Sequence, residues 1–187
     1  MKIYVVNGYP GVGKTTFERI VQNVLGSNRV TIWSTIDPIK SIARDLGWDG
    51  QKDARGRALL SDLKRALNLY NDFTMNKLRD VVFQIEDQEM YGVEHILFID
   101  SREPGEIAEI KRRYNATTIL IDRAIPQDLS NESDRHVEEF FYDKKIKNDK
   151  DLPTLGFRTM AFLIDEGFFS KDTLYTVYLD GDILTLS

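Results

Sequence analysis

Residues 8–16 combine the residue types that bind phosphate groups. Their sequence, GYPGVGKTT, fits the pattern G-x-x-x-x-G-K-T without a mismatch. Glycines let backbone N–H groups converge on phosphate oxygens, and the lysine of this pattern reaches the β- and γ-phosphates. The hydroxyl that follows the lysine is a ligand for Mg²⁺. The spacing therefore predicts a site for a nucleoside triphosphate, made by Gly8, Gly11, Val12, Gly13, Lys14, Thr15 and Thr16.

The flanking sequence supplies the elements that such a loop needs. An apolar run at residues 3–6 indicates a buried strand before the loop. After it, apolar residues recur at helical spacing, at Phe17, Ile20, Val21, Val24 and Leu25. A helix beginning at the loop adds free N–H groups and the positive end of its dipole. An ordinary glycine-rich turn is the alternative, which this strand–loop–helix context disfavours.

Asp100 is the candidate for the second ligand of a bound cation. It ends the apolar run at residues 95–100, which is typical of a parallel strand buried on both faces. In an open α/β sheet the carboxyl ends of the strands face the ligand crevice. We therefore expect Thr15 and Asp100 to hold Mg²⁺. The alternative is a strand-end acid without a ligand.

Three charged residues near predicted strand ends could serve a second substrate. Arg102 could grip a phosphate with two hydrogen bonds, or it could pair with Glu103 or Glu106. Asp37 and Lys40 follow the second predicted strand and lie within one helical turn of each other. They could orient an acceptor and hold its phosphate. The alternative is a capping acid and a solvated lysine.

Two arginines flank a polar segment at residues 123–137, which we interpret as a lid. Arg123 and Arg135 could neutralise the charge that spreads over a transferred phosphoryl group. The same segment carries several acids, so surface ion pairs are the alternative, above all for Arg135. His95 and His136 are predicted to be structural, because this chemistry does not need a histidine.

The remaining pattern predicts an α/β fold. Further strands are expected at residues 29–33, 117–121 and 144–147, and helices near 39–46, 53–91 with a break at Asn71 and Asp72, 103–114 and 152–166. Ser34 or Thr35 is the expected cap of the second helix, and Leu59, Leu63, Ala66 and Leu67 are the expected inward stripe of the third. Alternating strands and helices predict a three-layer sandwich, a parallel sheet with helices on both faces.

The organisation predicted for residues 1–187 is one domain. It carries a helical insertion at about 37–91 for an acceptor, the lid at about 123–137, and a C-terminal hairpin at about 173–187. The hairpin is indicated by Asp180-Gly181 between two apolar runs. It is expected either to extend the sheet or to make the contact of a homodimer.

Composition narrows the classes of partner. The chain has 187 residues, 42% of them hydrophobic and 29% charged, which is ordinary for a globular domain. A net charge of −5 does not favour nucleic acid as the main partner. There are no cysteines, and no apolar run approaches the ~20 residues that cross a membrane. We expect a cytoplasmic protein without a signal peptide or membrane partner.

The chain resembles the P-loop nucleoside monophosphate kinases, and most closely their bacteriophage-type branch, the deoxynucleoside monophosphate kinases. The loop alone is specific only for the wider superfamily. The resemblance is also carried by Asp-Pro-Ile-Lys at residues 37–40, Asp-Ser-Arg at 100–102 with Glu106, and Ile-Lys-Asn at 146–148. Its narrower signal is Gly-Trp-Asp-Gly at 47–50, followed by Gly-Arg-Ala-Leu-Leu at 56–60.

The resemblance implies transfer of the γ-phosphate of ATP to a (deoxy)nucleoside monophosphate, giving a diphosphate and ADP. Lys14 would stabilise the phosphoryl group in transfer, and Arg123 and Arg135 would close over the phosphates. The acceptor would be a small-molecule nucleotide, bound by Asp37, Lys40, Trp48, Arg57 and Arg102. Trp48 would either stack on a base or anchor its loop.

Other functions stay open at this point. The Asp-Arg-aromatic motif of thymidylate kinases is missing, and the C-terminal hairpin has no counterpart in the resemblance. A kinase for dephospho-coenzyme A or a nucleoside would carry the same loop. A GTPase would need Asn-Lys-x-Asp, whereas residues 148–151 read Asn-Asp-Lys-Asp. A non-catalytic nucleotide-binding protein is the third class.

Overall fold

The computed structural model describes residues 1–89, 92, 94–124 and 136–170. In chain order the elements are β1 (Lys2–Asn7), α1 (Lys14–Leu25), β2 (Val30–Ser34), α2 (Asp37–Asp45), α3 (Ala54–Asn71), α4 (Phe73–Glu89), β3 (Ile96–Asp100), α5 (Pro104–Tyr114), β4 (Thr117–Asp122), the 3-10 turn η1 (Val137–Glu139), β5 (Lys144–Lys147) and α7 (Leu152–Asp165). The predicted alternation of strands and helices is confirmed.

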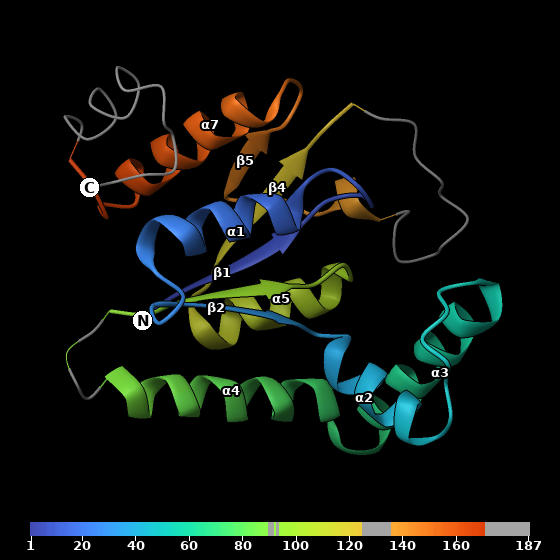
Figure 1. Ribbon diagram of the computed structural model, residues 1–187. Helices are drawn as coiled ribbons and strands as arrows, with labels where there is room; N and C mark the ends of the chain where they lie inside the picture. Colours follow the sequence, from blue (N-terminus) through green and yellow to red (C-terminus); the bar gives the residue numbers. More distant parts are fainter. Residues whose placement is uncertain (90–91, 93, 125–135, 171–187) are drawn as a thin grey trace.

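The strands form one parallel sheet with β1 at its centre. Their order is β2-β3-β1-β4-β5, and every neighbouring pair runs parallel. Val6 lies opposite Asp100 of β3 and opposite Ile119 of β4. In Figure 1 the strand arrows point toward the side on which α2 and α3 lie. The loop after β1 therefore leaves from the middle of the carboxyl edge of the sheet.

Helices α1 and α7 cover one face of this sheet (Figure 1). Their contact with it is an aromatic cluster in which Phe17 of α1 packs edge-on against Phe98 of β3 and Phe162 of α7, with ring centroids 5.7 and 5.4 Å apart. Tyr4 of β1 also packs against Phe98 and Phe162. These rigid aromatic contacts begin within one helical turn of Lys14. They therefore fix the direction of α1 close to the loop.

Helices α4 and α5 cover the opposite face. The predicted inward residues of α4, Met75, Leu78, Val82 and Ile85, are all buried, as are Ile107 and Ile110 of α5. They pack against the other side of the β1 and β3 strands. The three-layer α/β sandwich with helices on both faces is thus confirmed.

Helices α2 and α3 form a smaller apolar cluster of their own. Ile39 and Ala43 of α2 are fully buried there with Leu60 of α3. The predicted stripe of α3 is partly wrong: Leu63 and Leu67 pack on the cluster, but Leu59 is 40% exposed and Ala66 is also exposed, while Leu60 is buried. The cause is the packing of α3 on α2, which turns the face with Leu60 inward and places a lysine, Lys64, in a buried position.

The start of α2 also differs from the expectation. Its N-cap is Ile36, and no side chain caps it. Thr35 is buried instead, and its N–H donates to the carbonyl oxygen of Asp100 at 3.1 Å. The predicted caps, Ser34 and Thr35, are therefore wrong, because the backbone there continues the pairing of β2 with β3.

Lys64 ties α3 to the segment between β3 and α5. Its Nζ lies 3.0 Å from a carboxylate oxygen of Glu103 and 3.0 Å from one of Glu106. The hydroxyl of Ser101 donates to Glu106 at 2.5 Å. The side chains of Lys64 and Glu106 are only 10% and 7% exposed. This buried network joins the predicted acceptor helix to the residues next to Arg102.

Two predicted features lie largely or wholly outside the described residues. Most of the lid, residues 125–135, is among them, as is the C-terminal hairpin at about 173–187. The division into one domain with insertions stays a prediction. Within the described ranges, no helix is long and apolar enough to cross a membrane.

Loss of the Lys64 ammonium is predicted to destabilise the fold strongly. Lys64→Ala leaves the buried Glu106 carboxylate without its cation, which costs about 3–5 kcal/mol for a broken buried pair. Arg65→Ala is the matched control, because Arg65 and its partner Asp62 are 80% and 70% exposed, and a surface pair contributes about 0–1 kcal/mol. Urea unfolding of both variants measures the difference, and equal small losses would contradict the prediction.

Candidate functional site

The loop between β1 and α1 has a backbone that only glycine adopts readily. Gly8, Gly11 and Gly13 have φ angles of +147°, +76° and +100°. A Cβ at Gly8 would lie 2.5 Å from the carbonyl oxygen of Ile121, and one at Gly13 would lie 2.4 Å from Nδ2 of Asn148. The absence of side chains here brings the backbone N–H groups together at the start of α1. This backbone suits the phosphate site that the motif predicts.

Lys14 begins α1 and turns back over the loop. Its Nζ donates to the carbonyl oxygens of Gly8 at 2.6 Å and Tyr9 at 3.0 Å. Thr15 and Thr16 follow on the exposed first turn of the helix. The ammonium group therefore lies at the loop, and the hydroxyl groups are open to a ligand.

Two asparagines that the sequence analysis did not name as site residues fix the loop at its ends. Asn7 is fully buried and accepts a hydrogen bond from the N–H of Gly8 at 2.7 Å, while its amide donates to the Tyr142 hydroxyl at 2.6 Å. Asn148 donates to the carbonyl oxygen of Val12 at 2.8 Å. The available signal was an amide at the end of a predicted strand, once directly before the loop and once directly after β5.

Asp100 ends β3 beside the loop. Its Oδ1 is buried and has no hydrogen-bond partner among the described residues. Burial raises the pKa of this carboxyl above its ordinary value, while the charges of Lys14 and Arg102 oppose that shift. A buried carboxylate oxygen without a hydrogen-bond partner suits a hard, oxygen-seeking cation, as does the exposed hydroxyl of Thr15 at the start of α1. Asp100 and Thr15 thus fit a Mg²⁺ ion.

The same electrostatic neighbourhood includes Asp37 and Lys40. Asp37 acts on the pKa of Asp100 in the raising direction and Lys40 in the lowering direction. The two form an ion pair of 2.7 Å across one turn of α2, with side chains 53% and 21% exposed. The structure therefore brings five predicted site residues to one edge of the sheet: Lys14, Asp37, Lys40, Asp100 and Arg102.

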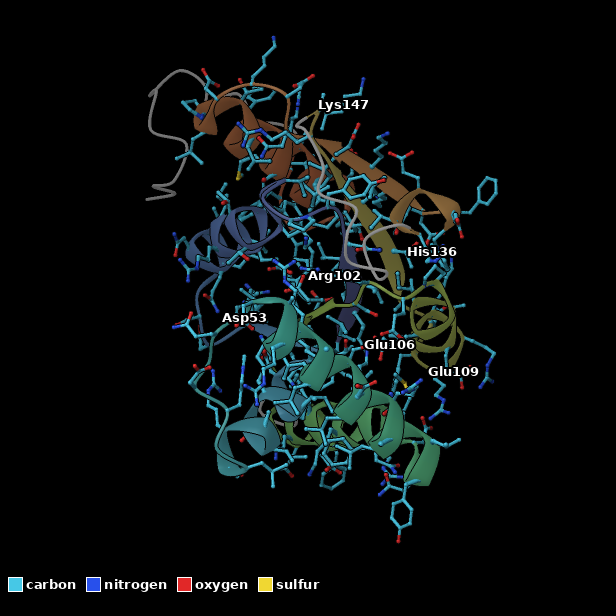
Figure 2. All side chains as sticks on the ribbon, turned by 90° about the vertical axis from the view of Figure 1, so that its right-hand side faces the viewer. Asp53, Arg102, Glu106, Glu109, His136 and Lys147 are labelled. Carbon is cyan, nitrogen blue, oxygen red and sulfur yellow. The ribbon has the colours of Figure 1, made fainter. Side chains whose placement is uncertain are left out.

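Arg102 lies at the centre of that edge. Figure 2 looks onto it and shows Arg102 near the middle of the view, between Asp53 at the start of α3 and His136. The acids proposed as its alternative partners, Glu103 and Glu106, are both held by Lys64. The charge of Arg102 lowers the pKa of Asp100, so Arg102 belongs to the electrostatic surroundings of that carboxyl.

The remaining predicted site residues are more distant or have other contacts. The indole N–H of Trp48 donates to the carbonyl oxygen of Gln51 at 3.0 Å, so Trp48 anchors its own loop against Gly56. Arg57 is exposed on the first turn of α3, and Arg123 is exposed directly after β4. Arg135 lies outside the described residues. Their functional roles stay predictions.

Glu18 is an acidic residue of the site that sequence reasoning missed. It lies on α1 one turn after Lys14 and is fully buried, and neither carboxylate oxygen has a hydrogen-bond partner in the part of the chain described. Burial, followed by the charge of Asp100, raises the pKa of Glu18 to about 9, against the opposing charge of Lys14. The sequence signal that could have identified Glu18 is its position as an acid within the apolar stripe of α1.

Comparison with known proteins gives weak likenesses. No family model and no curated protein matches the chain. Among solved structures, a sugar kinase from Janibacter sp. HTCC2649 is 14% identical over 87% of this chain and 92% of its own, with a TM-score of 0.42. Shikimate kinase from Aquifex aeolicus is 15% identical over 90% and 98%, with a TM-score of 0.43. Thymidylate kinase from Ehrlichia chaffeensis is 14% identical over 88% and 98%, with a TM-score of 0.44.

Those values are too low to carry an argument about this chain. The class of fold follows instead from its own geometry, which joins a glycine loop to the central strand of a parallel sheet and to a helix that begins at Lys14. The chain has a P-loop α/β fold.

Replacement of Gly8 is predicted to destabilise the protein by more than the backbone strain of a positive φ angle alone. Gly8→Ala places a Cβ against a backbone carbonyl, whereas Gly47→Ala, the control, has a φ of +94° and no atom within 4 Å of its Cβ. We expect Gly47→Ala to lose about 1–2 kcal/mol, and Gly8→Ala to lose about 1–3 kcal/mol more through overpacking. Chemical unfolding compares the two; equal losses would show that the loop yields to the added Cβ.

The pH dependence of stability tests the environment of Glu18. A carboxyl group whose pKa rises on folding keeps its proton in the folded chain while the unfolded chain loses it. The contribution of Glu18 to the free energy of unfolding is therefore complete below pH 4.5, its pKa in the unfolded chain. This contribution is lost as the pH rises toward about 9, the pKa of Glu18 in the folded chain.

The variant Glu18→Gln removes this titration while keeping the shape of the side chain. Without divalent cations, wild type is predicted to lose stability relative to Glu18→Gln between about pH 5 and 9, by at most about 1.4 kcal/mol per pH unit. Urea unfolding across this range measures the difference. Parallel profiles for the two proteins would place Glu18 in an environment where it ionises normally.

Proposed function

We propose that this protein is an ATP-dependent kinase that transfers the γ-phosphate to a (deoxy)nucleoside monophosphate. One observation carries the proposal: a phosphate loop with its lysine, an orphan buried carboxylate and an arginine converge at the carboxyl edge of one sheet. These residues are Lys14, Asp100 and Arg102. Phosphoryl transfer needs little covalent participation by the protein, but it needs positioned phosphates and compensation of their charge.

The donor side is the loop and the start of α1. The carbonyl oxygens of Gly8 and Tyr9 hold the Lys14 ammonium next to the loop, and phosphate oxygens of ATP would exchange with them as its partners. Thr15 and Asp100 would hold Mg²⁺, which neutralises charge on the phosphates when it is bound. Gly11, Val12, Gly13 and Thr16 would complete the ATP site.

The acceptor side is the region of α2 and α3. Asp37, Lys40 and Arg102 lie in the electrostatic neighbourhood of Asp100, so an acceptor phosphate held by Lys40 and Arg102 would lie close to the donor phosphates. The Arg102 guanidinium can donate hydrogen bonds to two phosphate oxygens at once. The Lys64 network supports this arrangement, because it fixes α3 to the residues that follow Arg102.

The choice of a nucleotide as acceptor rests on the resemblance to phage-type deoxynucleoside monophosphate kinases at residues 37–40, 47–60 and 100–102. In this proposal the partner is a small nucleotide, and Arg123 and Arg135 close over the phosphates to exclude water. Trp48 supports the acceptor region as the anchor of its loop rather than as a stacking surface.

ADP release from Mg-ATP with a panel of acceptors tests the proposal. The panel holds ribo- and deoxynucleoside monophosphates, a nucleoside, dephospho-coenzyme A and a control without acceptor. A strong rise with one monophosphate supports the proposal and identifies the substrate. A rise only with another acceptor assigns a different kinase. Equal release in all samples, the control included, indicates a hydrolase, and no release indicates a non-catalytic binder.

Removal of the loop lysine is predicted to abolish most turnover while the fold persists. In Lys14→Ala the phosphoryl group in transfer loses its nearest cation, and loss of one such contact lowers kcat about 10²–10³-fold. Initial rates with saturating ATP and acceptor measure the effect, and the unfolding midpoint confirms that the variant is folded. Unchanged turnover would remove Lys14 from the chemistry.

Arg57 is predicted to act on the acceptor alone. Arg57→Ala is expected to raise the acceptor KM about tenfold, which corresponds to about 1.4 kcal/mol, with little change in the KM for ATP. Arg55→Ala is the matched control, because Arg55 is equally exposed on the same turn of α3 but points to another side of the helix. Steady-state kinetics of both variants decide the matter. Arg57 would not be an acceptor residue if Arg57→Ala raised the KM for ATP together with that for the acceptor. The same conclusion would follow if Arg55→Ala raised the acceptor KM as much as Arg57→Ala does.

A further inference from the structure

Glu18 is a buried acid without an assigned task. Its side chain is fully buried between α1 and the sheet, and both carboxylate oxygens lack hydrogen-bond partners within the described ranges. A buried polar group without a partner is costly, and a buried charge is far more costly unless a cation balances it. A residue of this kind in an apolar helix face calls for a ligand.

The position of Glu18 points to the ligand. It follows Thr15 by three residues, so both side chains lie on the same side of α1. The charge of Asp100 acts directly on Glu18, and the buried Oδ1 of Asp100 is the only other unpartnered side-chain oxygen buried in the described part of the chain. The two unsatisfied acids are thus electrostatic neighbours, and Thr15 lies on the same side of α1 as Glu18.

Lys14 is a nearby cation, and three buried carboxylate oxygens of the two acids have no hydrogen-bond partner among the described residues. Lys14 acts on both acids electrostatically, but its ammonium donates hydrogen bonds to the carbonyl oxygens of Gly8 and Tyr9. Mg²⁺ sites of nucleotide enzymes usually combine one or two carboxylates with the phosphates of the substrate. When the cation binds, the second carboxyl releases its proton to solvent, and the carboxylate then supplies negative charge that the phosphates would otherwise bring.

We propose that Glu18 and Asp100, together with Thr15, bind a divalent cation in the absence of nucleotide. The ligand class is a hard cation such as Mg²⁺ or Mn²⁺, because the site offers only oxygen atoms. The protein then meets ATP with the cation already in place. This inference rests on the cation site of the proposed function, and it goes beyond that function by adding Glu18 and by removing the need for phosphates.

Binding of Mn²⁺ to the nucleotide-free protein tests the inference. Electron paramagnetic resonance measures free Mn²⁺ during a titration of the full chain, and calorimetry measures the stoichiometry. Wild type is expected to bind one Mn²⁺, with at least a tenfold weaker affinity in Glu18→Gln and in Asp100→Asn. Glu86→Gln, an exposed acid on α4, is the matched control and is expected to bind as wild type does.

Thermal unfolding gives an independent readout. Mg²⁺ without nucleotide is expected to raise the Tm of wild type and of Glu86→Gln, and to leave that of Glu18→Gln unchanged. Because the Gln variants are compared with and without cation, a general loss of stability does not imitate the result. Asp100→Asn serves as the second variant if Glu18→Gln is unstable.

The outcomes separate this inference from the proposed function. Wild type that binds no Mn²⁺ without nucleotide, or Glu18→Gln that binds it as tightly as wild type, would overturn the inference. Either result together with transfer of phosphate to a monophosphate leaves the kinase proposal standing. Nucleotide-free Mn²⁺ binding that depends on Glu18, in a protein without phosphotransfer, supports the inference and removes the kinase proposal.

Discussion

The structure depends on the close approach of the glycine loop to its neighbours. The loop passes so near the carbonyl oxygen of Ile121 and the amide of Asn148 that a Cβ at Gly8 or Gly13 would overlap them. This contact fixes the loop between β4 and the segment after β5, while Asn7 fixes its beginning. Everything that could bind phosphate is positioned from there.

The second constraint is electrostatic. The carboxyl edge of the sheet gathers the acids Glu18 and Asp100 under a loop that also carries Lys14. Burial disfavours the charged form of both acids, so their ionisation depends on the cations nearby. A phosphate-binding enzyme benefits from such a balance, because a bound cation and a lysine together can compensate the charge of a triphosphate.

Local sequence patterns predicted most of the fold. The loop, the parallel strands and the inward face of α4 follow from spacing alone, since each is decided within a few residues. The face of α3 did not, because Leu59 and Leu60 fit a helical stripe almost equally well. Its orientation is decided by contact with α2 and by the reach of Lys64 to Glu103 and Glu106, which are distant in the chain.

The candidate site shows the same division. Lys14, Asp100 and Arg102 were identified because each stands next to a motif or a strand end. Glu18, Asn7 and Asn148 were not named as site residues, because their importance comes from burial and, for the two asparagines, from contacts with segments distant in the chain. The contacts of Trp48 within its own loop likewise needed the structure.

Transfer of labelled phosphate tests the central claim most directly. The protein is incubated with ATP labelled in the γ-phosphate, Mg²⁺ and a mixture of nucleoside monophosphates, and the products are separated. The account predicts label in a nucleoside diphosphate, with little in free phosphate. Label that appears only in free phosphate, or remains in ATP, would contradict it.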